Sequence, residues 1–230
     1  GGTEASDLQH WLLRFGGTSL EFRKAVAEFV RWKANDDPPW AATRALRAGR
    51  LCGFDKHPGI RPVGIGETFE RLGSKCVLHV CGDEAKDACG ADQLCAGLEA
   101  GIEGGIHAAK LLWQEHAHEE EWEFLLVDAR NAFNEGNRML TLWTIRHEWP
   151  SGARCVFNCY RHFATLIIRN GRDHLFLTIL SKEGVTQGDP LAMVMCGVGL
   201  LPLIRLLKKS VPEVHQPWCA DDAGAGGRFQ

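Results

Sequence analysis

The pattern of hydrophobic and polar positions predicts that helices alternate with short strands along this chain. A capping-box pattern from Thr18 to Glu21 precedes apolar residues at helical spacing, and this helix is expected to end near Asn35, before Pro38-Pro39. A shorter helix is expected from about residue 40 to 48, followed by Gly49. Further helices are expected at about 67–80, 92–100, 102–118, 134–148 and 153–163.

Strand patterns separate these helices. Residues 54–65 predict two strands around a turn at Pro58-Gly59, and the apolar run 122–128 predicts a strand that ends in Asp128. Residues 165–169 and 174–179 flank Asn170-Gly171, which is a strong hairpin signal. Near the end, residues 214–220 predict a short strand, and residues 223–227 begin a return strand or loop.

The last long helix is expected over residues 189–209, with Asp189 as its N-cap, Pro190 at its first position and a kink at Pro202. It is apolar on nearly all sides, so we expect it to be buried. Glycine and proline break its apolar length too often for a membrane span, and no signal peptide pattern begins the chain.

Composition agrees with a globular protein. The chain has 230 residues, of which 45% are hydrophobic and 24% charged, enough for one large domain or two small ones. The nine cysteines, without secretory signals, predict reduced thiols in an intracellular protein, in either the nucleus or the cytoplasm. The cluster Cys76, Cys81, Cys89 and Cys95 has no C-x-x-C pair, which favours core thiols over a zinc site.

The net charge of −3 is unusual for an enzyme that acts on nucleic acid. Arginines are nevertheless concentrated between residues 138 and 172, with Glu148 as the single acid there. They are Arg138, Arg146, Arg154, Arg161, Arg169 and Arg172. They would either contact a phosphate backbone or form solvated helix faces, and for any one of them we favour the second interpretation.

Three places carry candidate chemistry. Lys56 and Arg61 flank the first predicted turn, where they would either bind a triphosphate or form an exposed basic hairpin. A carboxylate at the end of an apolar strand, such as Asp128, is costly unless it is paired or binds a cation. Adjacent Asp221 and Asp222 would either share a divalent cation, which relieves their repulsion, or form an ordinary surface turn.

In their order along the chain these signals resemble the reverse transcriptase family. The resemblance rests on Asp128 with Phe133, then on Gly184-Val185-Thr186-Gln187-Gly188-Asp189-Pro190-Leu191, and then on Ala220-Asp221-Asp222. Upstream, Lys56 and Gly59-Ile60-Arg61-Pro62-Val63 resemble the family's fingers motif. The likeness covers about Leu51 to Gly227 and is greatest to the polymerases of non-LTR retrotransposons.

The resemblance implies an α+β right-hand polymerase, with fingers and a palm whose small antiparallel sheet is backed by helices. Residues 1–50 would be an N-terminal helical segment, 51–121 the fingers and 122–230 the palm, with the helices and hairpin of 134–180 partly packing with the fingers. Because the chain starts and stops abruptly, we expect a piece of a longer protein, truncated at its C-terminus and without a thumb.

The resemblance also implies a role for each matching residue in an RNA-directed DNA polymerase, a nucleotidyltransferase. Two Mg²⁺ ions, or Mn²⁺, roughly 4 Å apart would be held by the three carboxylates. The three carboxylates are those of Asp128, Asp221 and Asp222. Lys56 and Arg61 would hold the triphosphate, and Gln187 and Gly188 would line the nucleotide pocket. Phe133 would be the steric gate against ribose. The implied partners are an RNA template, a DNA primer and deoxynucleoside triphosphates, with no membrane and no predicted oligomeric state.

Two alternatives stay open. An RNA-dependent RNA polymerase would share the palm, although Phe133 argues against it. A catalytically dead or repurposed nucleic-acid-binding domain is left open by the negative charge, by the missing thumb and by Cys219, which stands where many relatives have tyrosine. No endonuclease or RNase H motif is visible in the sequence.

Overall fold

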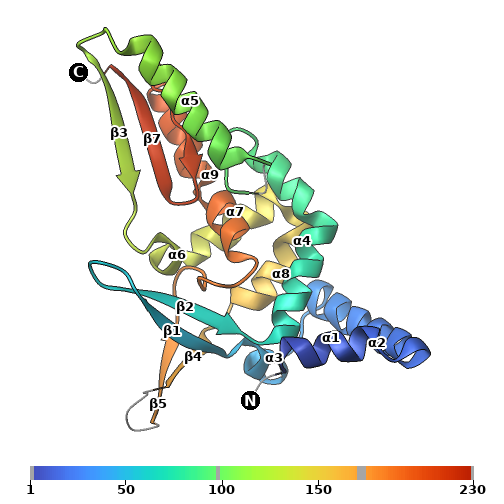
Figure 1. Ribbon diagram of the computed structural model, residues 1–230. Coiled ribbons are helices and arrows are strands. Elements are labelled where there is room, and N and C mark those ends of the chain that lie inside the picture. The colour runs from blue at the N-terminus through green and yellow to red at the C-terminus, as the bar shows by residue number, and fades with distance from the viewer. Residues whose placement is uncertain (1–2, 97–98, 170–174, 229–230) are drawn as a thin grey trace.

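A computed structural model describes residues 3–96, 99–169 and 175–228, which fold into two sheets beside a layer of helices (Figure 1). The described helices are α1 (Ala5–Leu13), α2 (Gly16–Asn35), α3 (Trp40–Arg47), α4 (Thr68–Cys89), α5 (Gly101–His116), α6 (Ala132–Glu135), α7 (Arg138–Glu148), α8 (Pro150–Tyr160) and α9 (Ala192–Ser210). The described strands are β1 (Gly49–Asp55), β2 (Ile60–Gly66), β3 (Trp122–Asp128), β4 (Ala164–Arg169), β5 (Phe176–Ser181), β6 (Trp218–Cys219) and β7 (Asp222–Arg228).

The two sheets differ in strand direction. The first has the order β2-β1-β4-β5 and is mixed, because β1 and β4 run parallel while β1 with β2 and β4 with β5 form antiparallel pairs. The second has the order β3-β7-β6 and is antiparallel throughout. The α+β class is therefore confirmed, as is the pairing of β4 with β5. The Asn170-Gly171 turn predicted between them lies outside the described residues.

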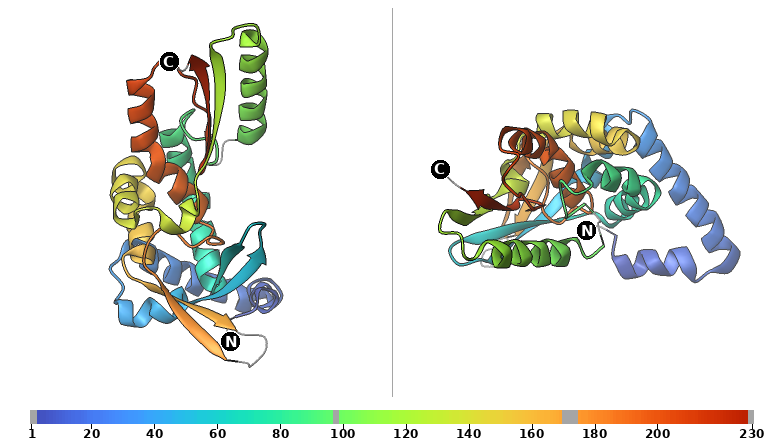
Figure 2. Two further views of the ribbon diagram at one scale, coloured as in Figure 1. Left: turned by 90° about the vertical axis from the view of Figure 1, so that its left-hand side faces the viewer. Right: turned by 90° about the horizontal axis from the view of Figure 1, so that it is seen from above.

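Both sheets lie on one side of the molecule, with α4, α7, α8 and α9 on the other (Figure 1). Helix α5 runs alongside β3 and β7, while α1 and α2 extend away from the sheets at the opposite end (Figures 1 and 2). The arrow of β3 points toward the hairpin formed by β1 and β2. This arrangement brings the last residue of β3 near the tip of that hairpin.

The core lies among α4, α7, α8 and α9, and its central side chain is Trp149. Its exposed fraction is 0%, like those of Ile145, Met195 and Val198 around it. The indole Nε1 of Trp149 donates a hydrogen bond of 2.7 Å to the carbonyl oxygen of Cys81, where α4 departs from helical geometry. This bond joins the indole to α4 at its irregular turn and gives the buried indole N–H group an acceptor.

Several helix boundaries differ from the sequence prediction. The capping-box residues Thr18 to Glu21 lie inside α2, which starts at Gly16. The helix expected at 134–148 is divided into α6 and α7, because Asn137 caps α7 by accepting a 2.8 Å hydrogen bond from the amide of Leu140. The helix expected at 92–100 is not formed: residues 91–96 make turns, and 97–98 lie outside the described residues.

Helix α9 is also shorter and less buried than expected. It begins at Ala192, with Leu191 as its N-cap in place of Asp189. Residues such as Met195 and Val198 are buried, whereas Met193, Leu203 and Leu206 are exposed, so the helix is buried on one face only. No helix in the described part of the chain is both long and apolar enough to cross a membrane.

All nine cysteines are free thiols. Burial raises the pKa of Cys89 to about 11 and that of Cys95 to about 12, so both remain protonated at neutral pH. Within residues 3–96, 99–169 and 175–228, the histidine, cysteine and acidic side chains form no group of three placed to hold a metal ion.

Candidate active site

The register of the second sheet brings two of the predicted aspartates together. In the antiparallel pair of β3 and β7, Asp128 lies directly opposite Asp222. Such partners have Cα atoms about 4.5–5.5 Å apart, and their side chains are on the same face of the sheet. Asp221 occupies the turn between β6 and β7, next to this pair. Residues nearly a hundred positions apart in sequence thus share one end of one sheet.

The small residues of β7 make this register possible. A Cβ atom at Gly226 would lie 2.8 Å from the ring of Trp122, and one at Gly224 would lie 3.0 Å from the ring of Phe124. The aromatic side chains of β3 can therefore lie across β7 only because those positions are glycine. The glycines that follow the aspartate pair thus leave room for the rings of Trp122 and Phe124 on β3.

A buried glutamine holds the turn that carries Asp221. Ala220 has a left-handed backbone with φ of 55°. Its amide donates a 2.6 Å hydrogen bond to Oε1 of Gln93, and Nε2 of Gln93 donates a 3.1 Å bond to the carbonyl oxygen of Ala220. Because Gln93 is only 1% exposed, this pair of bonds fixes a strained residue from inside the protein. Sequence reasoning missed Gln93, and no pattern around it would have revealed it.

A cavity of about 340 Å³, here called the aspartate cavity, opens between this sheet end and the β1–β2 hairpin. Of the predicted site residues, all except Gly188 line it: Lys56, Arg61, Asp128, Phe133, Gln187, Asp221 and Asp222. Ile60, Pro62, Ala129, Asn131, Ala132 and Asn134 complete the lining. The two elements that carry the basic and acidic side chains therefore face one another across a space of nucleotide size.

The fold and this cavity were compared with known proteins. No protein-family model and no curated protein sequence matches the chain. Among solved structures, the apo telomerase of Candida tropicalis truncated from its C-terminal domain aligns with a TM-score of 0.59 at 10% identity, covering 89% of this chain and 49% of that one. The telomerase of Candida albicans in complex with a TWJ fragment of telomeric RNA aligns with a TM-score of 0.58 at 11% identity, covering 91% of this chain and 42% of that one.

The fold is telomerase-like. Telomerase is a reverse transcriptase, so the reverse-transcriptase-like fold expected from the sequence agrees with these alignments. The chain spans about half the length of the solved structures that it matches. At such low identity the likeness concerns the fold. Any activity has to be argued from the residues of the aspartate cavity.

Electrostatics within the telomerase-like fold link the acidic and basic residues of the aspartate cavity. Burial and the neighbouring carboxylates of Asp221 and Asp128 raise the pKa of Asp222, while the ammonium group of Lys56 lowers it. Three carboxylates that repel one another in this way favour a bound cation, and hard divalent ions prefer carboxylate oxygens. The donor set therefore fits magnesium in its chemistry, although the described residues contain no group of three such side chains close enough to hold an ion.

The predicted residues Gln187 and Gly188 belong to a loop, here called the Gln187 loop (residues 183–189), that lies on β2. The amide of Gly64 donates a 2.8 Å hydrogen bond to the carbonyl oxygen of Gln187. Gly188 has φ of +106°, and a Cβ atom there would lie 2.5 Å from the carbonyl oxygen of Gly64. Only glycine fits both the backbone angle and the close approach. Gly188 thus lies outside the described lining but allows Gln187 to reach it.

Phe133 lies on α6, between the aspartate cavity and the Gln187 loop. Its side chain is half-buried and packs against the hydrophobic core. Its carbonyl oxygen accepts a 2.5 Å hydrogen bond from the amide of Val185. The ring is therefore held in place from the protein side while it lines the aspartate cavity.

Two of the arginines considered for phosphate contacts have internal roles. Arg138 is buried and donates hydrogen bonds to the carbonyl oxygens of Ser181, Glu183 and Gly184. Arg161 donates to the carboxylate of Asp37 and to the carbonyl oxygen of Pro38. Both interpretations, a phosphate contact and a solvated helix face, are therefore wrong for Arg138, which is buried and fixes the Gln187 loop. Arg161 joins α8 to the segment before α3.

Proposed function

We propose that this chain is the catalytic core of an RNA-directed DNA polymerase with fingers and palm, of the kind found in non-LTR retrotransposons. The observation that carries the proposal is the aspartate cavity, in which the acidic end of one sheet faces a basic hairpin and an aromatic ring. Its partners would be an RNA template, a DNA primer and deoxynucleoside triphosphates, and it would act inside the cell, in the nucleus or the cytoplasm.

Each residue has a distinct task in this proposal. Asp128, Asp221 and Asp222 would hold Mg²⁺, which when bound supplies positive charge that stabilises the primer hydroxyl and the leaving pyrophosphate. Lys56 and Arg61 bind and orient the triphosphate, because an ammonium and a guanidinium on one hairpin tip neutralise several phosphate oxygens. The side chain of Gln187 orients the nucleotide from the loop beside β2. Asp128 and Asp222 are strand partners, and Asp221 lies in the adjacent turn.

The direct test is incorporation of a deoxynucleotide by the purified chain on a primed RNA template. We expect extension of the primer by one nucleotide in Mg²⁺ or Mn²⁺, and none when the ions are removed with a chelator. Single-nucleotide extension resolved on a gel measures it. Binding of the primed template without incorporation in either ion would contradict the proposal and favour the second candidate, nucleic-acid binding without catalysis. The observation that favours this second candidate is that the described residues contain no group of three such side chains placed to hold a metal ion.

The Phe133→Val variant is expected to lose discrimination against ribonucleotides. A smaller side chain at this wall of the aspartate cavity leaves room for a 2′-hydroxyl, so the ratio of kcat/KM for deoxynucleotide over ribonucleotide should fall about tenfold or more. Steady-state incorporation of both nucleotides measures the ratio. Phe163→Val removes an exposed ring that does not line the cavity and serves as the control. An unchanged ratio in Phe133→Val would contradict the gate and leave an RNA-dependent RNA polymerase open.

A further inference from the structure

The Gln187 loop is attached to the rest of the protein through a buried carboxylate at its end, Asp189. Oδ2 of Asp189 accepts a 2.8 Å hydrogen bond from the hydroxyl of Tyr160 and a 3.4 Å bond from the guanidinium of Arg47. Oδ1 accepts a 3.0 Å bond from the amide of Leu191. The bond from Leu191 holds the turn that leads into α9, while the bonds from Tyr160 and Arg47 join this turn to distant elements.

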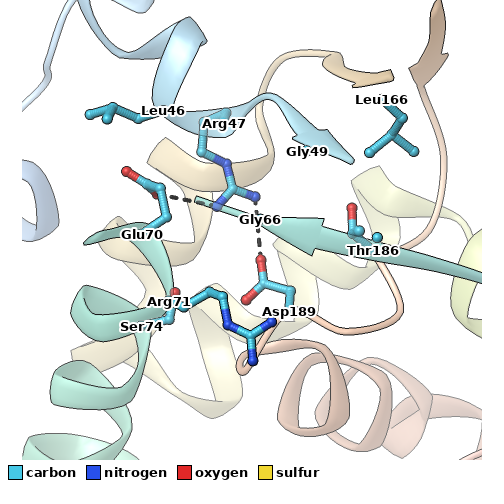
Figure 3. A pocket seen from close by; sticks show the side chains of 11 residues that line it. Leu46, Arg47, Gly49, Gly66, Glu70, Arg71, Ser74, Leu166, Thr186 and Asp189 are labelled. Carbon is cyan, nitrogen blue, oxygen red and sulfur yellow. Dashed lines mark hydrogen bonds and ion pairs between the residues drawn. The ribbon is translucent and has the colours of Figure 1, made fainter. Parts of the chain in front are cut away.

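Arg47 joins this carboxylate to the fingers side of the molecule. It is the last residue of α3, and its guanidinium lies between Glu70 on α4 and Asp189, as Figure 3 shows. Its two terminal nitrogens donate to these carboxylates, at 3.3 Å to Glu70 and 3.4 Å to Asp189. Glu70 also pairs with Lys33 of α2. Since all these side chains are largely buried, solvent screens the charges little.

Tyr160 holds the same carboxylate from the side of α8. The guanidinium groups of Arg47 and Arg138 lie over its ring, at 5.0 Å and 5.5 Å from the centroid. Burial, together with the carboxylate of Asp189, raises the pKa of Tyr160, so its hydroxyl keeps its proton and donates it. A space of about 20 Å³ beside the Arg47 bridge has room for about one water, which excludes a separate ligand site there.

The position of Arg47 in the chain gives these contacts a consequence for nucleotide binding. Two residues after Arg47, β1 begins, and the β1–β2 hairpin carries Lys56 and Arg61 at its tip. The same strand pair contacts the Gln187 loop again, at the bond from Gly64 to Gln187. Arg47 therefore links the base of the basic hairpin to the end of the Gln187 loop, and Lys56, Arg61 and Gln187 all line the aspartate cavity.

We propose that Arg47 and Tyr160, acting through Asp189, are positioning residues that set the distance between the Gln187 loop and the basic hairpin. Neither lines the aspartate cavity as described, so neither touches the nucleotide. Loosening Asp189 lets Gln187 move away from β2, which weakens nucleotide binding more than it slows the chemical step. This proposal rests on the proposed polymerase function and assigns two further residues to it.

The test compares Arg47→Lys and Arg47→Met with the same substitutions at Arg44, an exposed arginine on the same helix. A lysine keeps the charge but reaches only one carboxylate, so in Arg47→Lys the KM for deoxynucleotide should rise about tenfold while kcat stays within about twofold of wild type. In Arg47→Met the KM should rise further, because the charge is also lost. The Arg44 variants should match the wild type. Because loss of Arg47 could prevent folding, Tyr160→Phe, which removes one hydroxyl and keeps the ring, is the second variant, with an expected rise of about threefold.

Amide hydrogen exchange at Gly64 gives a readout that does not need activity. Its amide donates to Gln187, so exchange should be faster in the Arg47 and Tyr160 variants, while the amide of His215, which donates to Gly226 in the other sheet, should be unchanged. If the wild type is inactive but the variants still show faster exchange at Gly64, the polymerase function is contradicted and the positioning role is supported. Unchanged exchange and KM, or a fall in kcat alone, would overturn the positioning role.

Discussion

Replacement of Asp128 by asparagine is expected to lower nucleotide incorporation by about a hundredfold to a thousandfold, because it removes charge where the reaction develops charge. The backbone pairing of Asp128 with Asp222 does not involve the side chain, so the sheet should remain. Asp128 is exposed at the end of β3, and asparagine has nearly the same shape, so stability should change little. Single-nucleotide incorporation at saturating Mg²⁺ measures the loss, with thermal unfolding as the check on the fold.

The same variant should change the titration of its neighbour. The carboxylate of Asp128 is one of the groups that raise the pKa of Asp222, so its replacement by a neutral amide should lower that pKa. Asp83→Asn, on the exposed face of α4, is the matched control and should keep full activity. Activity within about threefold of wild type in Asp128→Asn would mean that the aspartates do not hold a catalytic ion together.

Much of the candidate site could be predicted from the sequence because local signals specify each part of it. An apolar run with a terminal carboxylate specifies β3 and the place of Asp128, and Pro58-Gly59 specifies the hairpin tip beside Lys56. The resemblance to reverse transcriptases then relates these parts to one another. It supplied what spacing alone does not contain, namely that the distant residues Asp128, Asp221 and Asp222 share one site. The structure adds that Asp128 and Asp222 are strand partners.

The residues that sequence reasoning missed act through long-range polar contacts. Gln93 and Arg47 have no local pattern that reports their partners, Ala220 and Asp189, which lie more than a hundred positions away. Tertiary contacts also override local propensity. The pattern at Asp189-Pro190 predicts a helix start, but α9 begins at Ala192, and the carboxylate of Asp189 also accepts hydrogen bonds from Tyr160 and Arg47, which no local pattern reports. Local patterns therefore predict the residues that line the aspartate cavity, but not the buried residues that hold the lining in place.

Replacement of Trp149 by alanine is expected to destabilise the protein by about 3–5 kcal/mol, the range for removing a large buried aromatic side chain. The indole is 0% exposed, and its Nε1–H group satisfies the carbonyl oxygen of Cys81 at the irregular turn of α4. Trp149→Ala thus opens a cavity and removes the hydrogen bond to the carbonyl oxygen of Cys81. The free energy of unfolding, measured by urea denaturation, reports both losses.

Two variants separate the parts of this effect. Trp149→Phe keeps most of the aromatic surface but loses the hydrogen bond, so it should lower the free energy of unfolding less than Trp149→Ala does. Loss of the hydrogen bond should account for about 1–3 kcal/mol of its effect. Trp143→Ala removes the same side chain from α7 at a position that is 59% exposed, and should cost about 0.5 kcal/mol or less. Equal costs for Trp149→Ala and Trp143→Ala would contradict the packing of α4, α7, α8 and α9 around one tryptophan. That helix layer includes α4, which supplies Glu70 to the Arg47 bridge, so the largest stability effect and the positioning of the Gln187 loop depend on the same layer.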